Sequence, residues 1–370
     1  MRLLFISSIK YWGGGEAWML SAVRGLTRRG HHVTLVCQPG SRLEARARQA
    51  GLKPTTVRMR GDLDPGVTFK FYRLIRRRRI QLVCANMDKE IRLAGPAATL
   101  AGIPLIRRRG SDIPFSNALR HRLANRLLVR RIIVNSRATR DTLLRANPWL
   151  AAEKLDLIYN GIALEDRGEG DRAAVVEEFG LSDRRPLLIV VGMLNSRKGH
   201  EVLFRALPRV WEEFPRPGLL VVGDGPLGEH LQELAATLGI ADGVRFAGFR
   251  NDVRRLIGAA DILVLPSRNE GFGYVLAEAM SLGKPVVASR ISSIPEVVRE
   301  GETGLLVPPG DAVALSEAIL DLARHPARAR RMGIEGRRWV KERFSLERML
   351  DELEALLART IGTPAEPPNA

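Results

Sequence analysis

The stretch ILVLPSRNEGFGYVLAEAMSLGKPVVAS, residues 262–289, contains two short aliphatic runs separated by a glycine loop and a helix-like segment. The runs Ile262–Leu265 and Pro285–Ala288 have the length and the aliphatic content of buried strands. A strand, a helix and a second strand in this order form a unit whose strands are parallel, because the helix returns the chain across the sheet. The stretch therefore predicts an α/β fold built on a parallel sheet.

The same alternation of strands and helices extends over most of the chain. In the first half we expect strands at Leu3–Ser7, Val33–Cys37, Gln81–Ala85, Pro104–Ile106 and Ile132–Asn135. In the second half we expect further strands at Leu187–Val191, Leu219–Val222 and Val244–Ala247. A length of 370 residues exceeds what one core usually organises. The sequence predicts two Rossmann-like, doubly wound parallel-sheet domains whose strand ends face a cleft.

The expected division of the chain follows from breaks in this pattern. The polar, glycine-containing stretch Glu165–Asp171 interrupts the alternation and separates an N-terminal domain, residues 1–163, from a C-terminal domain, residues 164–340. Beyond Gly336 the pattern is helical to about Arg359, and we expect residues 341–359 to pack back on the N-terminal domain. The Pro-rich residues 360–370 are expected to be disordered.

Arginine dominates the charge of the chain, which is +17 at pH 7. In the first half, Arg120, Arg122 and Arg126 alternate with leucines at 119, 123 and 127, as in a basic amphipathic helix on an anionic membrane. A solvated helix of an arginine-rich protein has the same pattern, so both interpretations stay open. Because no nucleic-acid-binding motif accompanies the charge, nucleic acid is not an expected partner.

Location and redox state are predicted from what the sequence contains. The start MRLLFISS resembles a strand rather than an export signal, and no apolar run approaches the roughly 18 residues of a membrane span. We therefore expect a cytoplasmic protein, with peripheral contact to the inner face of the cytoplasmic membrane as an open alternative. Cys37 and Cys84 lie within apolar runs, which favours buried, reduced thiols over a disulfide.

Gly13-Gly14-Gly15-Glu16 follow the first predicted strand and precede a helix that we expect to begin near Glu16. Unpaired N–H groups at a helix N-terminus bind anions, although a plain tight turn has the same sequence. A dinucleotide-binding motif would need a small residue where the chain has Trp18, and an acidic residue where it has Cys37-Gln38-Pro39. A nicotinamide cofactor is therefore not expected.

Two further loops follow strands of the second half. Arg197 and Lys198 are adjacent cations in the loop after the strand Leu187–Val191, where they could neutralise a diphosphate leaving group or form only a solvated loop. Glu270 and Glu278 are eight residues apart in the loop and helix after Ile262–Leu265, so both carboxylates can face one bound molecule. The alternative for Glu278 is a favourable early-helix carboxylate without a ligand.

The residues NEGFGYVLAEAMSLGKPVVAS, with PEVV at 295–298 and GETGLLVPPGD at 301–311, resemble the donor-binding half of glycosyltransferase family 4, a retaining GT-B family. VVGDGP at 221–226, FAGF at 246–249, NGI at 160–162 and the N-terminal GGGE are similar to further motifs of that family. The resemblance implies an acceptor-binding N-terminal domain and a C-terminal domain that binds the nucleotide-sugar donor.

The resemblance also implies roles for individual residues. Glu270 would contact hydroxyls of the donor sugar, Glu278 would hold the ribose, and Arg197 and Lys198 would contact the diphosphate. Glu270, Arg197 and Lys198 are thus the expected catalytic residues. The remaining donor contacts are expected from backbone groups of Gly271, Phe272, Gly273 and Tyr274, and from Gly14 and Gly15 near the β-phosphate and the acceptor.

Two departures from the family pattern concern charge near the donor. Met193 stands where many members have an arginine, which leaves Arg197 and Lys198 to carry that charge. Many members also have a first-domain histidine near residues 103–112, where this chain has Arg107-Arg108-Arg109-Gly110-Ser111-Asp112. Either Arg109 takes its place or the correspondence to the family is loose there. The donor-binding half has no Asp-x-Asp metal motif, so neither a metal nor another cofactor is expected.

The sequence predicts a retaining, metal-independent hexosyltransferase that uses a nucleotide sugar, with a UDP-sugar favoured over a GDP- or ADP-sugar. The expected acceptor is a cell-envelope glycan or a lipid-linked molecule such as lipopolysaccharide, because the first half is basic. A glycosidase that uses Glu270 and Glu278 would leave the phosphate-binding features without a role. The alternative from another class is a non-catalytic scaffold that binds a nucleotide sugar or a membrane.

Overall fold

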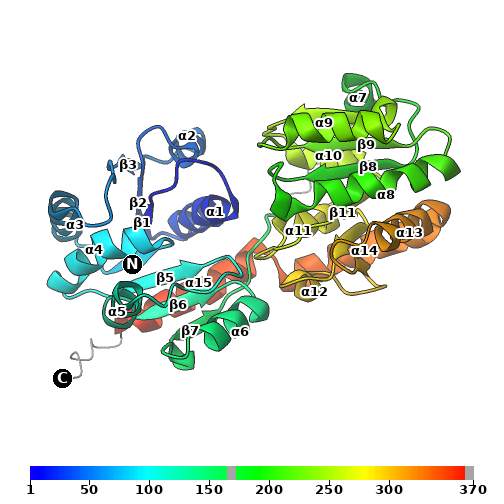
Figure 1. Ribbon diagram of the computed structural model, residues 1–370. Helices are drawn as coiled ribbons and strands as arrows, with labels where there is room; N and C mark the ends of the chain where they lie inside the picture. Colours follow the sequence, from blue (N-terminus) through cyan, green and yellow to red (C-terminus); the bar gives the residue numbers. More distant parts are fainter. Residues whose placement is uncertain (165–171, 363–370) are drawn as a thin grey trace. The chain divides into compact units, whose positions relative to one another are not determined.

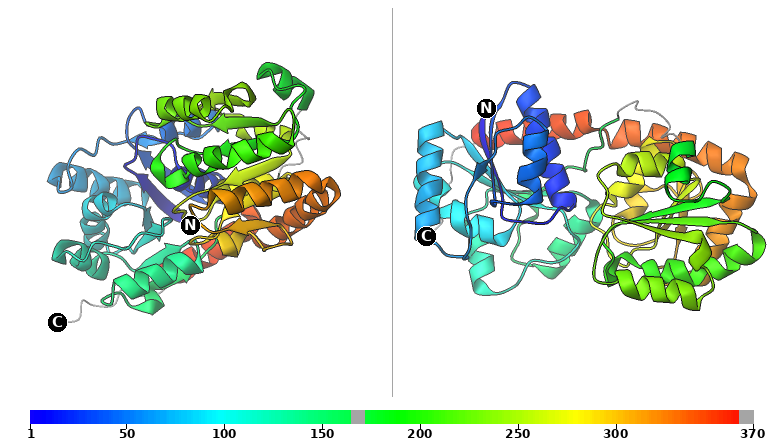
Figure 2. Two further views of the ribbon diagram at one scale, coloured as in Figure 1. Left: turned by 45° about the vertical axis from the view of Figure 1, so that its right-hand side comes forward. Right: turned by 90° about the horizontal axis from the view of Figure 1, so that it is seen from above.

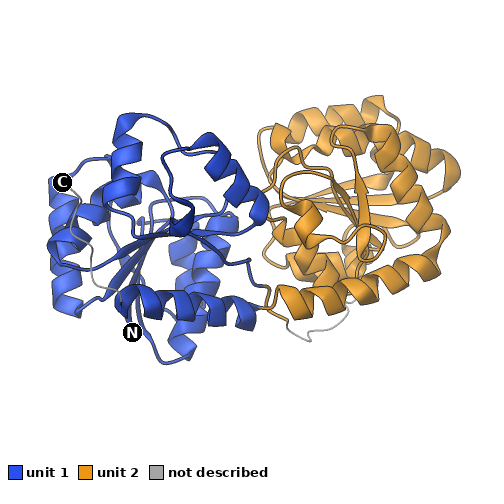
Figure 3. Ribbon diagram, turned by 90° about the horizontal axis from the view of Figure 1, so that it is seen from below, with its two compact units in different colours: residues 1–161, 346–370 blue, residues 162–345 orange. Residues whose placement is uncertain are grey.

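The computed structural model describes residues 1–164 and 172–362. It divides into two compact units, the first formed by Met1–Gly161 and Leu346–Ala370 and the second by Ile162–Ser345 (Figure 3). The connection predicted at Glu165–Asp171 lies outside the described residues. The same holds for residues 363–370 of the tail that was expected to be disordered, whereas residues 360–362 belong to the last helix.

Unit 1 contains a seven-stranded sheet in the order β3-β2-β1-β4-β5-β6-β7, and all paired strands are parallel. Helices lie on both of its faces (Figures 1 and 2). The strands are β1 (Arg2–Ser7), β2 (His32–Cys37), β3 (Thr55–Thr56), β4 (Leu82–Ala85), β5 (Leu105–Arg109), β6 (Arg131–Val134) and β7 (Leu155–Leu157). The α-helices are α1 (Gly14–Arg28), α2 (Arg42–Gln49), α3 (Pro65–Arg78), α4 (Asp88–Leu100), α5 (Leu119–Leu127), α6 (Arg137–Ala146) and α15 (Leu346–Gly362), and a 3-10 turn spans Ala152–Lys154.

Unit 2 contains a six-stranded parallel sheet in the order β10-β9-β8-β11-β12-β13. Its strands are β8 (Leu187–Val191), β9 (Gly218–Val222), β10 (Val244–Gly248), β11 (Ile262–Leu265), β12 (Val286–Ser289) and β13 (Gly304–Val307). Its α-helices are α7 (Arg172–Glu178), α8 (His200–Glu213), α9 (Gly228–Thr237), α10 (Val253–Ala259), α11 (Tyr274–Ser281), α12 (Ile294–Val297), α13 (Ala312–Arg324) and α14 (Pro326–Arg343), with 3-10 turns at Ser196–Lys198 and Ala241–Gly243.

Both strand orders reverse direction next to the first strand of the sheet, at β1/β4 in unit 1 and at β8/β11 in unit 2. In a doubly wound sheet this reversal opens a crevice at the carboxyl ends of the two strands, because the following helices lie on opposite faces. The predicted α/β class with two doubly wound parallel sheets is confirmed. The structure also adds β3, β7 and β13, three short strands that the sequence pattern did not indicate.

The helix expected to continue from Gly336 to Arg359 is two helices. α14 ends at Arg343, and α15 begins at Leu346 after a break at Phe344 and Ser345. Phe344 turns inward and is buried, and its carbonyl accepts a hydrogen bond from the N–H of Ile162 at 2.8 Å. The two places where the chain passes between the units are therefore joined by a backbone hydrogen bond.

Helix α15 completes unit 1 although it is the last element of the chain. A Cβ atom on Gly25 of α1 would lie 2.3 Å from Leu350, so only glycine allows the two helices to approach this closely. Arg29, one residue beyond α1, pairs with Glu347 and Asp351 of α15 at 2.7 Å each. Within the described residues, no helix is long and apolar enough to cross a membrane.

Candidate active site

Two glycine loops pack backbone to backbone at the carboxyl ends of β8 and β9 in unit 2. The N–H of Leu194 donates to the carbonyl of Asp224 at 3.0 Å. A Cβ atom on Gly223, whose φ is +142°, would lie 1.9 Å from the carbonyl oxygen of Gly192. The VVGDGP sequence therefore fixes the loop that carries Arg197 and Lys198 instead of leaving it free in solvent.

The 3-10 turn at Ser196–Lys198 presents the two predicted cations. The side chain of Asn195 caps this turn by accepting the N–H of Arg197 at 3.1 Å. Gly199 then takes a left-handed conformation, with φ at +68°, and a Cβ atom there would lie 1.9 Å from the carbonyl oxygen of Pro266. The turn after β8 is thus packed against the end of β11.

Lys198 and Glu270, 72 residues apart in sequence, form an ion pair of 2.6 Å between Nζ and Oε2. The hydroxyl of Ser267 is 3.3 Å from the same carboxylate oxygen. Beside this pair, Arg197 Nη2 donates to Asn269 Oδ1 at 3.1 Å. The structure therefore brings together the two cations and the first glutamate of the predicted site, on the loops that follow β8 and β11.

The predicted contact residues Gly271–Tyr274 connect this ion pair to helix α11. Gly273 is the N-cap of α11 in the left-handed conformation, with φ at +77°. Phe272 is buried, and its ring packs edge-on against those of Tyr274 and Phe344 with 5.5 Å between ring centroids in each case. Since the Phe272 ring faces the core, the loop offers its backbone groups and the N-terminus of α11 to a ligand.

Glu278 lies in the second turn of α11 and is partly buried. Burial raises the pKa of its carboxyl to about 7, and the positive charge of Arg254 opposes that rise. Arg254 itself donates to the hydroxyl of Ser281 at 3.2 Å. Glu278 is therefore a carboxylate whose charge changes near neutral pH.

His200, the first residue of α8, is a buried polar group that sequence reasoning missed. Its side chain is 1% exposed, and neither ring nitrogen has a hydrogen-bond partner within residues 1–164 and 172–362. Burial, together with the charge of Lys198, lowers the pKa of this imidazole to about 4. His200 is therefore neutral at physiological pH and adds no charge next to Lys198.

The glycine turn of unit 1 contains the other two predicted contacts. Gly13 is the N-cap of α1, which begins at Gly14, two residues before the start expected from the sequence. A Cβ atom on Gly15 would lie 3.7 Å from Asn86 Nδ2 and 3.9 Å from Arg108 Nη1. The N-terminus of α1 thus has an amide and a guanidinium beside it.

Within the Arg107–Arg109 run, the arginine next to the glycine turn is Arg108 rather than Arg109. Arg109 donates through Nε to the carbonyl of Ile113 at 3.2 Å and stacks on Phe115. Arg108 is 3% exposed, stacks on Trp18 of α1 and donates to Asn160 Oδ1 at 2.9 Å. Successive side chains of a strand point to opposite faces, so only one face of β5 reaches α1.

Comparison with known proteins gives two family matches that together span most of the chain. Residues 171–339 match the family described as Glycosyl transferases group 1, and residues 12–166 match Glycosyltransferase Family 4.

Among curated proteins, the chain is 31% identical over 353 residues to a GDP-mannose-dependent alpha-(1-6)-phosphatidylinositol monomannoside mannosyltransferase of Mycolicibacterium smegmatis, with 90% of this chain and 91% of that protein covered. It is 35% identical over 217 residues to a D-inositol 3-phosphate glycosyltransferase of Mycobacterium sp. (strain KMS), with 55% and 47% covered. Among solved structures, Anabaena Alr3699/HepE in complex with UDP and glucose has a TM-score of 0.86 at 23% identity, with 97% of this chain and 99% of that chain covered.

Proposed function

The chain belongs to the glycosyltransferases of group 1 and family 4, and on this basis we propose that it transfers a hexose from a nucleotide-sugar donor to an acceptor hydroxyl with retention of anomeric configuration. Membership rests on the two family matches and on the mannosyltransferase relative, which is covered over 91% of its length. The fold is that of the GT-B glycosyltransferases, as expected. Catalysis of glycosyl transfer follows from membership, whereas the donor, the acceptor and the stereochemistry are proposed.

The observation that carries the donor site is the ion pair between Lys198 and Glu270. The pair holds a cation and a carboxylate side by side on two loops, which pack closely where Gly199 meets the carbonyl of Pro266. The diphosphate of the nucleotide sugar carries the negative charge that Lys198 and Arg197 can neutralise. The hydroxyls of its sugar can donate hydrogen bonds to the carboxylate of Glu270. The backbone N–H groups at the start of α11 add a further anion-binding element.

In the proposed reaction, the bond between C1 of the sugar and the phosphate oxygen breaks while the acceptor oxygen attacks C1 from the same face. The proton of the acceptor hydroxyl passes to the departing phosphate oxygen, so no protein base is needed. Negative charge on the leaving diphosphate grows as the bond breaks, and fixed cations stabilise it most in that state. Lys198 and Arg197 therefore act on the transition state, and Glu270 positions the sugar.

For the donor, a UDP-sugar stays the first prediction, and GDP-mannose is the second candidate because the mannosyltransferase relative depends on it. We further propose that turnover needs no divalent metal. Thermal-shift and donor-hydrolysis measurements with UDP-, GDP-, ADP- and dTDP-sugars, with and without EDTA, test both points. Stabilisation by one nucleotide with slow hydrolysis in EDTA supports the proposal. No stabilisation by any of them would favour the non-catalytic scaffold.

We propose an anionic acceptor of the cell envelope, of which a lipopolysaccharide or another lipid-linked molecule is an example. The names of both curated relatives contain a phosphate-bearing molecule, a phosphatidylinositol monomannoside in one and D-inositol 3-phosphate in the other. Unit 1 of this chain is rich in arginine, and Arg107–Arg109 end strand β5, which suits such an acceptor.

Helix α5 supports contact between unit 1 and an anionic membrane surface. Leu119, Leu123 and Leu127 are 66%, 44% and 62% exposed, and they recur at a spacing of four residues along one side of the helix. Arginines at 120, 122 and 126 are exposed beside them, and no acidic residue occurs between residues 113 and 140. Apolar and cationic side chains together bind an anionic lipid surface.

Vesicle sedimentation tests the membrane contact. Reversing the charge at Arg120, Arg122 and Arg126 should abolish sedimentation with vesicles that contain phosphatidylglycerol and leave donor hydrolysis unchanged. A matched variant reverses three exposed arginines of unit 2, at 209, 216 and 290, and should sediment like the wild-type protein. Equal sedimentation of both variants would exclude α5 as the contact.

A further inference from the structure

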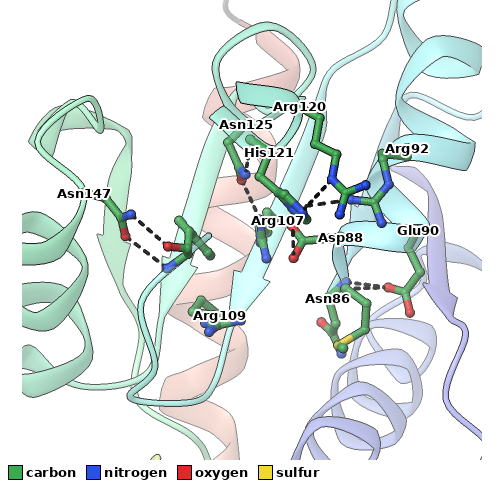
Figure 4. Close-up of polar contacts among 12 residues, drawn as sticks. Asn86, Asp88, Glu90, Arg92, Arg107, Arg109, Arg120, His121, Asn125 and Asn147 are labelled. Carbon is green, nitrogen blue, oxygen red and sulfur yellow. Dashed lines mark hydrogen bonds and ion pairs between the residues drawn. The ribbon is translucent and has the colours of Figure 1, made fainter. Parts of the chain in front are cut away.

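Arg92, Arg120 and His121 lie beside the ion pair between Arg107 and Asp88 in unit 1, near the start of α4 and α5 (Figure 4). Arg107 of β5 is fully buried, and its Nη1 is 2.8 Å from Asp88 Oδ1 and 2.6 Å from Asn125 Oδ1. Burial lowers the pKa of Arg107 to about 10, while the charge of Asp88 opposes this shift. The charge of Asp88 is thus largely matched from the inside of the fold.

The outer part of this group has more positive than negative charge. Arg92 of α4 forms an ion pair with Asp62, and its other terminal nitrogen, Nη1, is 3.5 Å from His121 Nδ1. Arg120 Nε approaches the opposite ring nitrogen of His121 at 3.3 Å. Three arginines face two aspartates, Asp62 and Asp88, which leaves an excess of one positive charge.

A carboxylate oxygen, Asp88 Oδ2, faces His121 Nδ1 at 3.7 Å, which is beyond hydrogen-bonding distance. A neutral imidazole has one acceptor nitrogen and one N–H, yet both ring nitrogens of His121 face arginine N–H groups. One of the two contacts therefore brings two donors together. Arg92 and His121 have side chains that are only 12% exposed, so bulk water supplies few of the missing acceptors. An oxyanion beside these side chains would accept from both arginines and from the imidazole.

We propose that Arg92, Arg120 and His121 form a binding site for a phosphate group of the acceptor. The side chains come from α4 and α5. Asn125 ties α5 to β5 by donating to the carbonyl of His121 at 2.8 Å while accepting from Arg107. Two guanidinium groups suit a phosphate because each can donate two N–H groups to its oxygens. The site deepens the proposed function, since it gives the acceptor a defined chemical class.

The phosphate can belong to a soluble acceptor or to a lipid headgroup, and two measurements separate these sources. The first is titration of the full-length protein with inorganic phosphate and with glycerol 3-phosphate. The second is binding to vesicles of phosphatidylcholine with and without phosphatidylglycerol. The variants are Arg92→Gln and Arg120→Gln, and the matched control is Arg122→Gln, an exposed arginine of the same helix outside the site.

For a soluble source, we expect Arg92→Gln and Arg120→Gln each to weaken phosphate and glycerol 3-phosphate binding at least tenfold, with Arg122→Gln within twofold of wild type. For a lipid source, soluble phosphate does not bind, and Arg92→Gln lowers binding to the anionic vesicles much more than Arg122→Gln does. Equal effects of Arg92→Gln and Arg122→Gln in both measurements would overturn the site. Melting temperatures show whether each variant is folded. If Arg92→Gln unfolds the protein, Arg120→Gln still tests the site, because Arg120 is exposed and its replacement should not affect folding.

The same protein preparations separate this site from the donor reaction. Donor-sugar hydrolysis without acceptor depends on unit 2, so it should stay within twofold of wild type in all three variants. Loss of phosphate binding with intact hydrolysis supports the site. A wild-type protein that binds phosphate but hydrolyses no donor would refute the proposed function and leave the phosphate site intact.

Discussion

Replacing Lys198 with alanine should lower kcat about 10²- to 10³-fold and barely change stability. In the free protein, Lys198 and Glu270 are 25% and 15% exposed, and Ser267 still faces the carboxylate after the lysine is removed. Partly exposed ion pairs contribute up to about 1 kcal/mol, so the free energy of unfolding should change by no more than that. In the reaction, removing one fixed hydrogen-bond donor that stabilises a developing anion raises the activation free energy by about 2.7–4 kcal/mol. Each increase of about 1.4 kcal/mol lowers the rate tenfold.

The assay is initial-rate nucleotide release at saturating donor, with a melting curve for each variant. Lys198→Arg keeps the charge and should recover part of the lost rate. Arg197→Ala is the comparison, because Arg197 is more exposed and contacts the neutral Asn269 at 3.1 Å. The kcat of Arg197→Ala should fall less, by about tenfold, because a solvated guanidinium stabilises the anionic transition state less than a partly buried ammonium does. A Lys198→Ala variant with kcat within threefold of wild type and normal melting would refute the role of the ion pair.

Three further outcomes are expected. The KM for the nucleotide sugar should fall as the pH rises through about 7, because only the ionised Glu278 accepts hydrogen bonds from both ribose hydroxyls. The KM of Glu278→Gln should be independent of pH. If this variant shows the same pH dependence of KM as the wild-type protein, Glu278 is not part of the site. His200→Leu should raise the free energy of unfolding by about 1 kcal/mol, because a buried group without partners disappears. In the wild-type protein the free energy of unfolding should decrease as the pH falls from 6.5 to 4, because His200 binds a proton in the unfolded chain but stays neutral when buried. The His200→Leu variant should lack this decrease, and chemical denaturation at several pH values measures it. Gly199→Ala should lower the melting temperature far more than Gly239→Ala, because both have φ at +68° but only the first places Cβ on a carbonyl oxygen; equal losses would mean that backbone strain alone is responsible.

The parts of the fold that the sequence predicted well are those with a strong local pattern. β8, β9, β11 and β12 are aliphatic runs of four or five residues, and glycine loops follow β8, β9 and β11. Parallel strands end at one edge of their sheet, so residues just after two neighbouring strands come together. That rule is why Lys198 and Glu270 could be expected in one site, although their direct ion pair across 72 residues of sequence was not predicted.

The parts that the sequence did not predict depend on tertiary contacts. β7 is only Leu155–Leu157, and its middle residue, Asp156, is charged, so the aliphatic pattern fails; its carboxylate is matched by Arg131 and Arg359, both at 2.7 Å. β13 contains four residues and begins at Gly304, where a Cβ atom would lie 2.5 Å from Val286. At both places the strand forms because it pairs with a neighbouring strand. Local residue propensity does not predict this pairing.

The choice between Arg108 and Arg109 shows a signal that the sequence did contain. Both residues belong to β5, and strand alternation places Arg107 and Arg109 on the same face, where they share Phe115. Arg108 must then point to the opposite face, toward α1. The expected strand ended at Ile106, which hid this alternation, because side chains beyond the end of a strand have no fixed facing.

Helix α15 has a consequence for the order in which the protein forms during synthesis. A ribosome makes residues 1–161 first, but the groove on α1 that receives Leu350 stays empty until residue 350 has emerged, after all of unit 2. Residues 1–161 therefore keep an apolar face of α1 exposed while some 180 further residues are synthesised. Nascent chains that stall before Leu346 should therefore be substrates for chaperones, and a shortened gene that stops there should yield insoluble protein.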